Sequence, residues 1–444
     1  MAPSSHIAVL AFPFGSHPIP MLNLVKRIAA SAPENVNFSF FCTPESNKSY
    51  FSGAKGDEEF ANIKAYSVWD GVPKDHLFSG NSQLERIGLF LNATPGNFEM
   101  AMKEAEQETG VKICCLLTDA FLGFAGDLAE KIGVPWVPFW TSGSCSLAAH
   151  LYTDEIRKLA STTERTIGMI PGMEGLSIGD MPREILLTNE QSPIALLLYN
   201  VALNLPRATA VVVNSFEELD PAISLDLKPR FKNYLNISPF HSIAAQHNDE
   251  CLEWLRKQDD ASVVYIGFGS VSIPSPNEMV ALAEALETCK FPFLWSLRDH
   301  ARKSLPAGFI DGTSGFGKLV SWAPQMEVLA SGKVGVFVSH GGWNSVLESI
   351  SFGVPMICRP FFGDHGLNGA MVEVKWRIGL RVEDGIFTKN ETVNAIKLIL
   401  SGEKGKEIKE NAQLLKGLAT DAVKPNGSSA RNFQELLKVI TKSS

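Results

Sequence analysis

The run from residue 322 to 365, WAPQMEVLASGKVGVFVSHGGWNSVLESISFGVPMICRPFFGDH, constrains the fold more than any other stretch of this chain. Its segment VGVFVS has the β-branched and aromatic composition of a buried parallel strand. A glycine-containing turn follows, Asn344 and Ser345 supply helix-capping chemistry, and VLESISFG predicts a helix that ends at Gly353. The run therefore predicts a strand, a tight turn and a helix.

This unit also predicts a ligand. A helix that begins just after a glycine turn at the carboxyl end of a strand has unpaired N–H groups, which bind anions. We therefore expect a phosphate-bearing ligand near Gly342–Ser345. Spacing alone leaves one alternative open, an ordinary strand–helix unit that binds nothing.

Alternating strands and helices continue on both sides of this run. At 444 residues the chain is too long for one ordinary domain, and the alternation predicts two doubly wound α/β domains with a cleft between the carboxyl ends of their sheets. We expect a first domain at 1–240, a linker at 241–250, a second domain at 251–425 and a terminal helical segment at 426–444. Within the first domain we expect a helix over 86–97, and TAVVVNSFEEL as the last strand.

Composition narrows the class of protein. Apolar residues make up 45% and charged residues 20%, and the net charge is −8 without a long basic run, which argues against a nucleic-acid-binding or membrane-surface protein. No signal-peptide pattern or apolar run of about 18 residues occurs. The seven cysteines include no C-x-x-C pair, which argues against a zinc site or a disulfide framework. We expect a monomeric, cytoplasmic enzyme.

Two titratable residues stand at expected strand ends. His17 lies in the loop FPFGSHPIP after the first strand, and Asp119 ends the apolar strand ICCLLTD. A carboxylate behind a histidine fixes its tautomer and stabilises the imidazolium, so the two could form a general base. The alternative for His17 taken alone is a surface loop histidine.

Several motifs together resemble one family. The run 322–365, with VLAFPFGSH, FSFFCTPESN, LTDAF, FWTSGS, NSFEELDP and PFLWSL, resembles the plant UDP-dependent glycosyltransferases of family 1, and among them the flavonoid and anthocyanidin 3-O-glycosyltransferases. The resemblance implies the GT-B fold, in which two Rossmann-like domains face each other and the last helix returns to the first domain. It also implies inverting transfer of a hexose from a UDP-sugar to a flavonoid 3-hydroxyl.

The resemblance assigns roles to residues of this chain. His17 and Asp119 become the catalytic pair. The residues implied to bind the UDP-sugar are Ser270, Trp322, Ala323, Gln325, His340, Trp343, Asn344, Ser345, Glu348, Trp140, Thr141, Asp364 and His365. The residues implied to bind the acceptor are Ser16, Gln83, Phe121 and His150, although His150 on its apolar helix is also interpreted as a core histidine.

The sugar and the cofactor requirement are separate questions. Glucose-using relatives usually have Gln where this chain has His365, and His there is associated with galactose users, so UDP-galactose is favoured and UDP-glucose is the alternative. No D-x-D pair occurs, so we expect no metal and no other cofactor. Two alternative functions are a non-catalytic sugar-nucleotide-binding protein, which the presence of both His17 and Asp119 disfavours, and a Rossmann oxidoreductase, which the absence of G-x-G-x-x-G spacing disfavours.

Overall fold

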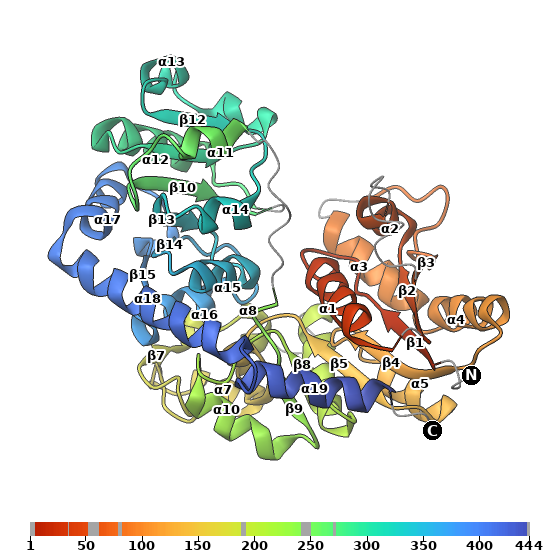
Figure 1. Cartoon of the computed structure of the whole chain (residues 1–444). Helices are drawn as coiled ribbons and strands as arrows, with labels where there is room; N and C mark the ends of the chain where they lie inside the picture. The colour runs from red at the N-terminus through yellow and green to blue at the C-terminus, as the bar shows by residue number, and fades with distance from the viewer. Residues whose placement is uncertain are drawn as a thin grey trace.

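The chain folds into two α/β domains, each built on a parallel sheet (Figure 1). The structure is a computed structural model that describes residues 5–33, 35–51, 62–78, 82–187, 192–240, 250–269 and 272–441. The expected linker at 241–250 lies outside these residues except for Glu250, where helix α11 (Glu250–Leu255) begins. The domain boundaries stay predictions.

In the first domain, the described residues form a seven-stranded parallel sheet in the order β3-β2-β1-β4-β5-β8-β9. Its strands are β1 (Ser5–Leu10), β2 (Val36–Cys42), β3 (Ile63–Ser67), β4 (Ile113–Asp119), β5 (Trp136–Trp140), β8 (Val211–Val213) and β9 (Tyr234–Asn236). Strands β1, β4 and β5 are buried almost throughout, because helices cover both faces of the sheet.

Two of our expectations for this domain were wrong. The helix expected over 86–97 is two helices, α3 (Ser82–Ala93) and α4 (Gly96–Thr109), because Pro95 lacks the N–H that a continuous helix would need. The last strand is β9, not the strand at TAVVVNSFEEL, which forms β8. With three residues, β9 is too short to show a periodic pattern.

The first domain also contains further helices and a separate two-stranded antiparallel hairpin. The helices are α1 (Pro18–Ser31), α2 (Pro44–Phe51), α5 (Ala125–Ile132), α6 (Ser144–Leu151), α7 (Thr153–Ala160), α8 (Arg183–Leu186), α9 (Pro193–Asn204) and α10 (Pro221–Leu227). The hairpin pairs β6 (Thr166–Ile167) with β7 (Leu176–Ser177).

In the second domain, the described residues form a six-stranded parallel sheet in the order β12-β11-β10-β13-β14-β15. Its strands are β10 (Val263–Gly267), β11 (Phe293–Ser296), β12 (Gly317–Val320), β13 (Val334–Ser339), β14 (Met356–Cys358) and β15 (Gly379–Arg381). Its helices are α12 (Pro276–Cys289), α13 (Phe309–Thr313), α14 (Gln325–Ala330), α15 (Trp343–Phe352), α16 (His365–Ala370) and α17 (Lys389–Ser401).

Each sheet has a point where the strand order reverses, and ligands bind beside such points in open α/β sheets. In the first sheet it lies between β1 and β4, where Leu10 pairs with Thr118, one residue before Asp119. In the second it lies between β10 and β13, where Gly267 pairs with Ser339, one residue before His340. Both polar residues therefore emerge at the carboxyl edges of their sheets.

The two domains are joined by packing as well as by the chain. One cluster of buried apolar residues runs from the first domain into the second and includes Ala148, Trp343 and Trp376. The long helix α18 (Glu403–Val423) leads into α19 (Ser428–Thr441), which lies along the first sheet beside β9 (Figure 1). Helix α19 thus buries its apolar side chains against the first domain.

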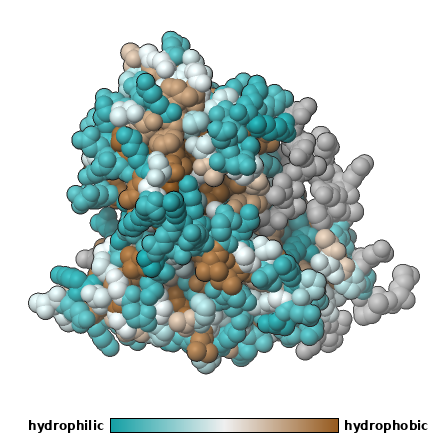
Figure 2. Space-filling model, turned by 60° about the vertical axis from the view of Figure 1, so that its left-hand side comes forward, coloured by the Kyte–Doolittle hydropathy of each residue, from teal (hydrophilic) through white to brown (hydrophobic). Residues whose placement is uncertain are grey.

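The face shown in Figure 2 is mainly hydrophilic, with hydrophobic side chains in separate patches. Within the described ranges, no helix combines the length and the apolar character needed to cross a bilayer.

Candidate active site

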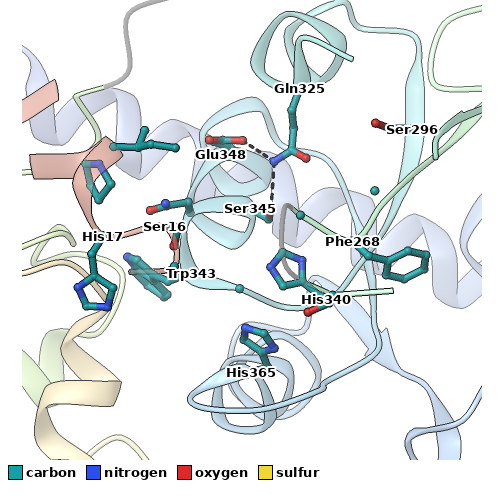
Figure 3. A pocket seen from close by; sticks show the side chains of 18 of the residues that line it. Ser16, His17, Phe268, Ser296, Gln325, His340, Trp343, Ser345, Glu348 and His365 are labelled. Atoms are coloured by element: carbon teal, nitrogen blue, oxygen red, sulfur yellow. Dashed lines mark hydrogen bonds between the residues drawn. The ribbon is translucent and has the colours of Figure 1, made fainter. Parts of the chain in front are cut away.

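A cavity of about 470 Å³ lies between the carboxyl ends of the two sheets. Its lining includes Ser16, His17, Gln83 and Thr141 from the first domain. From the second domain it includes Trp322, Ala323, Gln325, His340, Trp343, Asn344, Ser345, Glu348, Asp364 and His365. The structure therefore brings most of the sequence-predicted site residues to one place (Figure 3).

His17 and Asp119 form a hydrogen-bonded pair at the first-domain wall of this cavity. His17 Nδ1 lies 2.8 Å from Asp119 Oδ2, and Asp119 Oδ1 accepts the backbone N–H of Phe121 at 2.9 Å. The Asp119 side chain is 1% exposed, whereas that of His17 is 19% exposed. Because the carboxylate accepts the Nδ1 proton, Nε2 remains free to accept a proton from a substrate.

Aromatic side chains surround the ring of His17. Its centroid lies 4.4 Å from that of Phe121 and 5.2 Å from that of Phe12. Behind Phe121, the Trp140 and His150 rings lie 5.5 Å apart, and both residues are buried. Burial lowers the pKa of His150 to about 4, so its ring is neutral. Trp140 and His150 thus lie buried behind Phe121, which is itself half-buried beside His17.

In the second domain a small polar network centres on Gln325. Its Nε2 donates to Glu348 Oε2 at 2.7 Å and to Ser345 Oγ at 3.0 Å, and its Oε1 accepts from the buried Tyr265 hydroxyl at 3.5 Å (Figure 3). The tyrosine fixes which way the amide points. Burial raises the pKa of Glu348 to about 7, far above the usual range of a carboxyl.

Helix α15 begins at the cavity, as the sequence predicted, but its start differs in detail. Gly342 is the N-cap and makes no side-chain cap, so Asn344 and Ser345 lie inside the first turn and do not cap the helix. The Trp343 side chain turns toward the first domain, where its Nε1 donates to the Asn214 carbonyl at 2.7 Å. The first N–H groups of α15 remain beside the cavity, where they can meet an anion.

His340 and His365 lie together next to this helix start, with ring centroids 4.8 Å apart. Burial lowers the pKa of His340 to about 3, helped by the neighbouring His365, and burial lowers that of His365 to about 4. Both rings are therefore neutral at pH 7. The backbone N–H of Phe362 donates to His365 Nδ1 at 3.5 Å, which leaves the ring proton on Nε2.

Sequence reasoning missed several residues at the cavity. Ser142, whose hydroxyl donates to Asp364 Oδ2 across the domain boundary, is separated from it by 222 positions. Tyr265, Arg298 and Phe362 also line the cavity. The only signal for Ser142 was its place beside Thr141 in FWTSGS; Tyr265 was hidden in an apolar strand. Ser270 lies outside the described residues, and within them no group of three or more His, Cys, Asp or Glu is arranged to hold a metal ion.

Comparisons with known proteins show which family this chain resembles. A family model described as UDP-glucoronosyl and UDP-glucosyl transferase matches residues 220–426. An anthocyanidin 3-O-glucosyltransferase from Gentiana triflora is 54% identical, with 100% of this chain and 99% of that protein aligned. An anthocyanidin 3-O-galactosyltransferase from Actinidia chinensis var. chinensis is 50% identical, with 98% and 97% aligned.

A solved structure is similar over the full length as well. It is the crystal structure of a UDP-glucose: anthocyanidin 3-O-glucosyltransferase in complex with UDP, with a TM-score of 0.94, 40% identity and 100% of both chains covered. The similarity therefore extends over both domains and the cleft between them.

Proposed function

This chain belongs to the family of UDP-dependent glycosyltransferases, and we propose that it transfers a hexose from a UDP-sugar to the 3-hydroxyl of a flavonoid. The flavonoid is either a flavonol or an anthocyanidin. One observation carries the proposal: the His17–Asp119 pair faces the same cavity as the start of helix α15. A general base and an anion site on opposite walls suit the transfer of a sugar from a diphosphate to a hydroxyl.

In the proposed reaction His17 is the general base. Its Nε2 takes the proton of the flavonoid hydroxyl, and the oxygen attacks the anomeric carbon as the bond from that carbon to the UDP oxygen breaks. Attack from the face opposite the leaving group inverts the anomeric configuration and gives a β-linkage from an α-linked donor. Asp119 stabilises the imidazolium that forms, because its carboxylate already accepts the Nδ1 proton.

The second domain holds the UDP moiety in this proposal. Trp322, 70% exposed at the cavity, stacks on the uracil ring, and the Ala323 backbone pairs with its edge. Glu348 and Gln325 hold the ribose hydroxyls. The N–H groups at the start of α15, with Asn344, Ser345 and His340, stabilise the leaving diphosphate. We place Ser270 there as well, on the resemblance alone.

We further propose that no metal takes part in the transfer. The helix start and neutral His340 supply hydrogen-bond donors at the place where a metal would otherwise bridge the diphosphate, and the sequence has no D-x-D pair. Full activity in EDTA is expected, and a strict Mg²⁺ requirement would contradict this part of the proposal.

The acceptor occupies the first-domain side of the cavity. Ser16 and Gln83 line it and offer hydrogen bonds to the flavonoid hydroxyls, and Phe121 holds the ring of His17. His150 lies behind the wall, so it contacts an acceptor only if the wall moves. Of the proposed acceptor contacts, Ser16 and Gln83 are therefore the ones that the geometry supports best.

UDP-galactose is the favoured donor and UDP-glucose the alternative. Asp364 and His365 line the sugar end of the cavity with Thr141, while Trp140 supports that wall from behind. With its ring proton on Nε2, His365 is a single hydrogen-bond donor, whereas a Gln amide both donates and accepts. A single donor suits the axial 4-hydroxyl of galactose. Relatives of both specificities are similar to this chain, so the comparisons do not choose between the sugars.

One assay tests the donor and the acceptor together. Purified protein is given quercetin or kaempferol with UDP-galactose, UDP-glucose or UDP-rhamnose, and the product is analysed for its linkage position. We expect a 3-O-β-galactoside as the main product. The His365→Gln variant should shift the preference toward UDP-glucose; an unchanged preference would show that His365 does not select the sugar.

A further inference from the structure

The junction between the two domains at the sugar end of the cavity is organised around Asn214, the residue that follows β8. Asn214 is 3% exposed, and its backbone N–H donates to the Trp140 carbonyl at 3.0 Å. Its side-chain Nδ2 donates to the Thr141 carbonyl at 3.0 Å, and its Oδ1 accepts from the Ser238 hydroxyl. Its own carbonyl accepts Trp343 Nε1 from the second domain.

Trp343 fits this junction by shape as well as by its hydrogen bond. A Cβ added at Gly143 would lie only 2.6 Å from the Trp343 ring, so the indole packs directly on the glycine backbone. Trp343 is also the first residue of α15, whose start faces the cavity. Where the indole is seated on the first domain therefore decides where the start of α15, and any nucleotide bound to the second domain, lies relative to His17.

The loop that Asn214 holds carries two further contacts with the reaction site. Thr141 Oγ1 lies 3.2 Å from Nδ1 of the proposed base His17. The next residue, Ser142, donates to Asp364, the proposed sugar-binding carboxylate of the second domain. Asn214 thus touches neither substrate directly, yet it fixes a loop that contacts both halves of the site.

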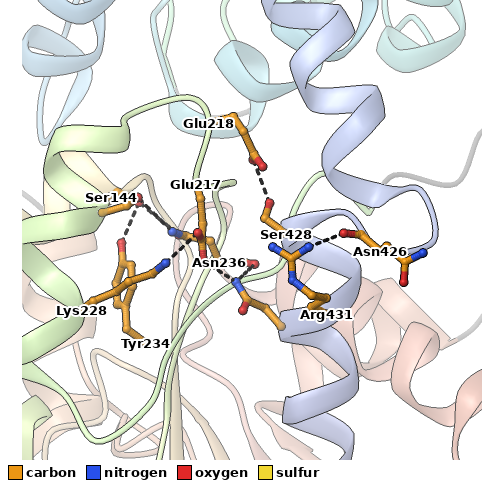
Figure 4. Close-up of polar contacts among 11 residues, drawn as sticks. Ser144, Glu217, Glu218, Lys228, Tyr234, Asn236, Asn426, Ser428 and Arg431 are labelled. Atoms are coloured by element: carbon orange, nitrogen blue, oxygen red, sulfur yellow. Dashed lines mark hydrogen bonds and ion pairs between the residues drawn. The ribbon is translucent and has the colours of Figure 1, made fainter.

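The far side of the junction is fixed by the C-terminal helix. Ser429 of α19 donates to the Ser238 carbonyl at 2.6 Å, and Ser238 in turn binds Asn214. Beside this chain of contacts, Ser144 donates to Asn236 Oδ1 at 3.1 Å (Figure 4). Asn432 of α19 donates to the Asn236 carbonyl at 2.9 Å. The loop after β5 is therefore held from behind by β9 and α19.

From these contacts we propose that Asn214 is a positioning residue for sugar transfer, which seats Trp343 and the 141–144 loop so that His17 and the donor sugar face each other correctly. The inference rests on the proposed function. Only an amide serves both side-chain contacts, because it donates to the Thr141 carbonyl and accepts from the Ser238 hydroxyl. In Asn214→Asp a carboxylate oxygen would face the Thr141 carbonyl and push the loop away.

The expected signature is a loss of turnover with preserved nucleotide binding. The uridine contacts lie within the second domain, so Asn214→Asp and Asn214→Ala should leave the Kd for UDP within about twofold of the wild type. Misplacing reacting groups by about 1 Å can cost on the order of 100-fold in rate, so we expect kcat to fall by roughly 10- to 100-fold. If Asn214 had a purely structural role, its substitution would lower the amount of folded protein, but the protein that does fold would keep both the kcat and the Kd for UDP of the wild type.

A matched control stands at the other end of the same strands. Asn233 Nδ2 donates to the Thr209 carbonyl at 2.8 Å, the same kind of amide-to-backbone contact, but at the amino ends of β8 and β9, away from the cavity. Asn233→Asp should keep the kcat of the wild type. All variants are compared by calorimetric UDP titration, steady-state kinetics and thermal melting.

A second variant tests the proposed role of Asn214 even if Asn214→Asp fails to fold. Trp343→Phe keeps the ring on Gly143 but removes the donor to the Asn214 carbonyl, so kcat should fall while UDP still binds. The inference is overturned if folded Asn214→Ala keeps the wild-type kcat, if Asn233→Asp loses as much, or if Trp343→Phe turns over normally. Failure of the wild type itself to transfer sugar would instead contradict the proposed function.

Discussion

Burial shifts the pKa values of several titratable side chains around the cavity. His340 and His365 are held neutral because their rings are buried, and Glu348 has its pKa raised toward 7 for the same reason. His17 differs from these two histidines, because it combines an exposed edge with a buried carboxylate partner. It is the histidine of the cavity best suited to exchange a proton with a substrate.

The proposed catalytic pair, His17 and Asp119, gives the first prediction. His17→Ala removes the base, and Asp119→Asn removes the charge that stabilises the imidazolium, so each should lower kcat by about 10²- to 10⁴-fold. Binding of UDP-sugar should persist, because its contacts lie mainly in the second domain. Single-turnover assays with calorimetric binding would measure both. Unchanged turnover in His17→Ala with retained binding would contradict the mechanism and leave the non-catalytic alternative.

Glu348 gives a prediction for pH. Ribose hydroxyls donate to a carboxylate, so the ionised form binds the donor better, and with a pKa of about 7 only about a tenth of the side chains are ionised at pH 6. The affinity for UDP-glucose, whose diphosphate does not titrate near neutrality, should therefore weaken about tenfold from pH 8 to pH 6. Calorimetric titrations across this range would measure the change. Glu348→Gln should show weaker binding that does not follow pH, and an equally steep slope in that variant would assign the effect to another group.

At the scale of elements, helix α19 shows how a distant segment supports the first domain. It buries Phe433, Leu436 and Ile440 against the first sheet, and the Arg27 guanidinium of α1 lies 4.3 Å from the centre of the Phe433 ring. Polar contacts then fix the helix along its axis. Ser428 donates to Glu218 (Figure 4), and Asn432 donates to Glu217.

The Phe433→Ala variant tests this packing. Truncating a buried phenylalanine removes apolar contact and leaves a cavity, so the free energy of unfolding should fall by about 3 to 5 kcal/mol. Urea denaturation would measure it. Lys438→Ala on the exposed face of the same helix should change stability by less than about 0.5 kcal/mol. Equal effects from both variants would show that α19 contributes through its helical structure and not through this contact.

At the scale of the whole molecule, contacts between the domains combine apolar packing with charge. Arg381 pairs with Asp180, and Lys375 pairs with Glu174, each joining the second domain to the first. At the same interface, Trp376 Nε1 donates to the buried Asp220 Oδ1 at 2.9 Å. Burial raises the pKa of Asp220 to about 7. The interface therefore holds a carboxyl group that is costly to ionise.

This carboxyl group makes stability depend on pH. Between pH 4 and pH 7 the folded protein keeps a proton on Asp220 that the unfolded chain releases. The stabilisation that comes from the protonated carboxyl group is therefore fully present below about pH 4 and is lost as pH rises through 7. Over the full window the loss is on the order of 4 kcal/mol. Asp220→Asn keeps the Trp376 acceptor without the titration.

Melting temperatures of wild type and Asp220→Asn at pH 5, 6, 7 and 8 would measure the effect. The melting temperature of Asp220→Asn relative to that of the wild type should increase as pH rises, and most of this increase should be reached by pH 8. A constant difference would show that Asp220 does not titrate in this range.

The local sequence pattern was enough to predict the two sheets and to place residues at their carboxyl edges. Apolar strands alternating with helices predicted the doubly wound architecture, which the structure and its likeness to a solved glycosyltransferase confirm. Asp119 and His340 could be placed because parallel strands end at a common edge. The pattern predicted element bounds less accurately where an element is short or interrupted, as for β9 and for the helix break at Pro95.

The sequence by itself determined the family, the fold and many of the residues that line the cleft, because these depend on local hydrophobic period and on motifs read in order. Only the tertiary structure decided how the two domains meet. Trp343 turns toward the first domain, and Ser142 contacts Asp364, because of how the two sheets are placed relative to each other. Neither contact produces a periodic pattern in the sequence. The run from 322 to 365 therefore predicted a nucleotide site, but its contacts with the first domain are visible only in the fold.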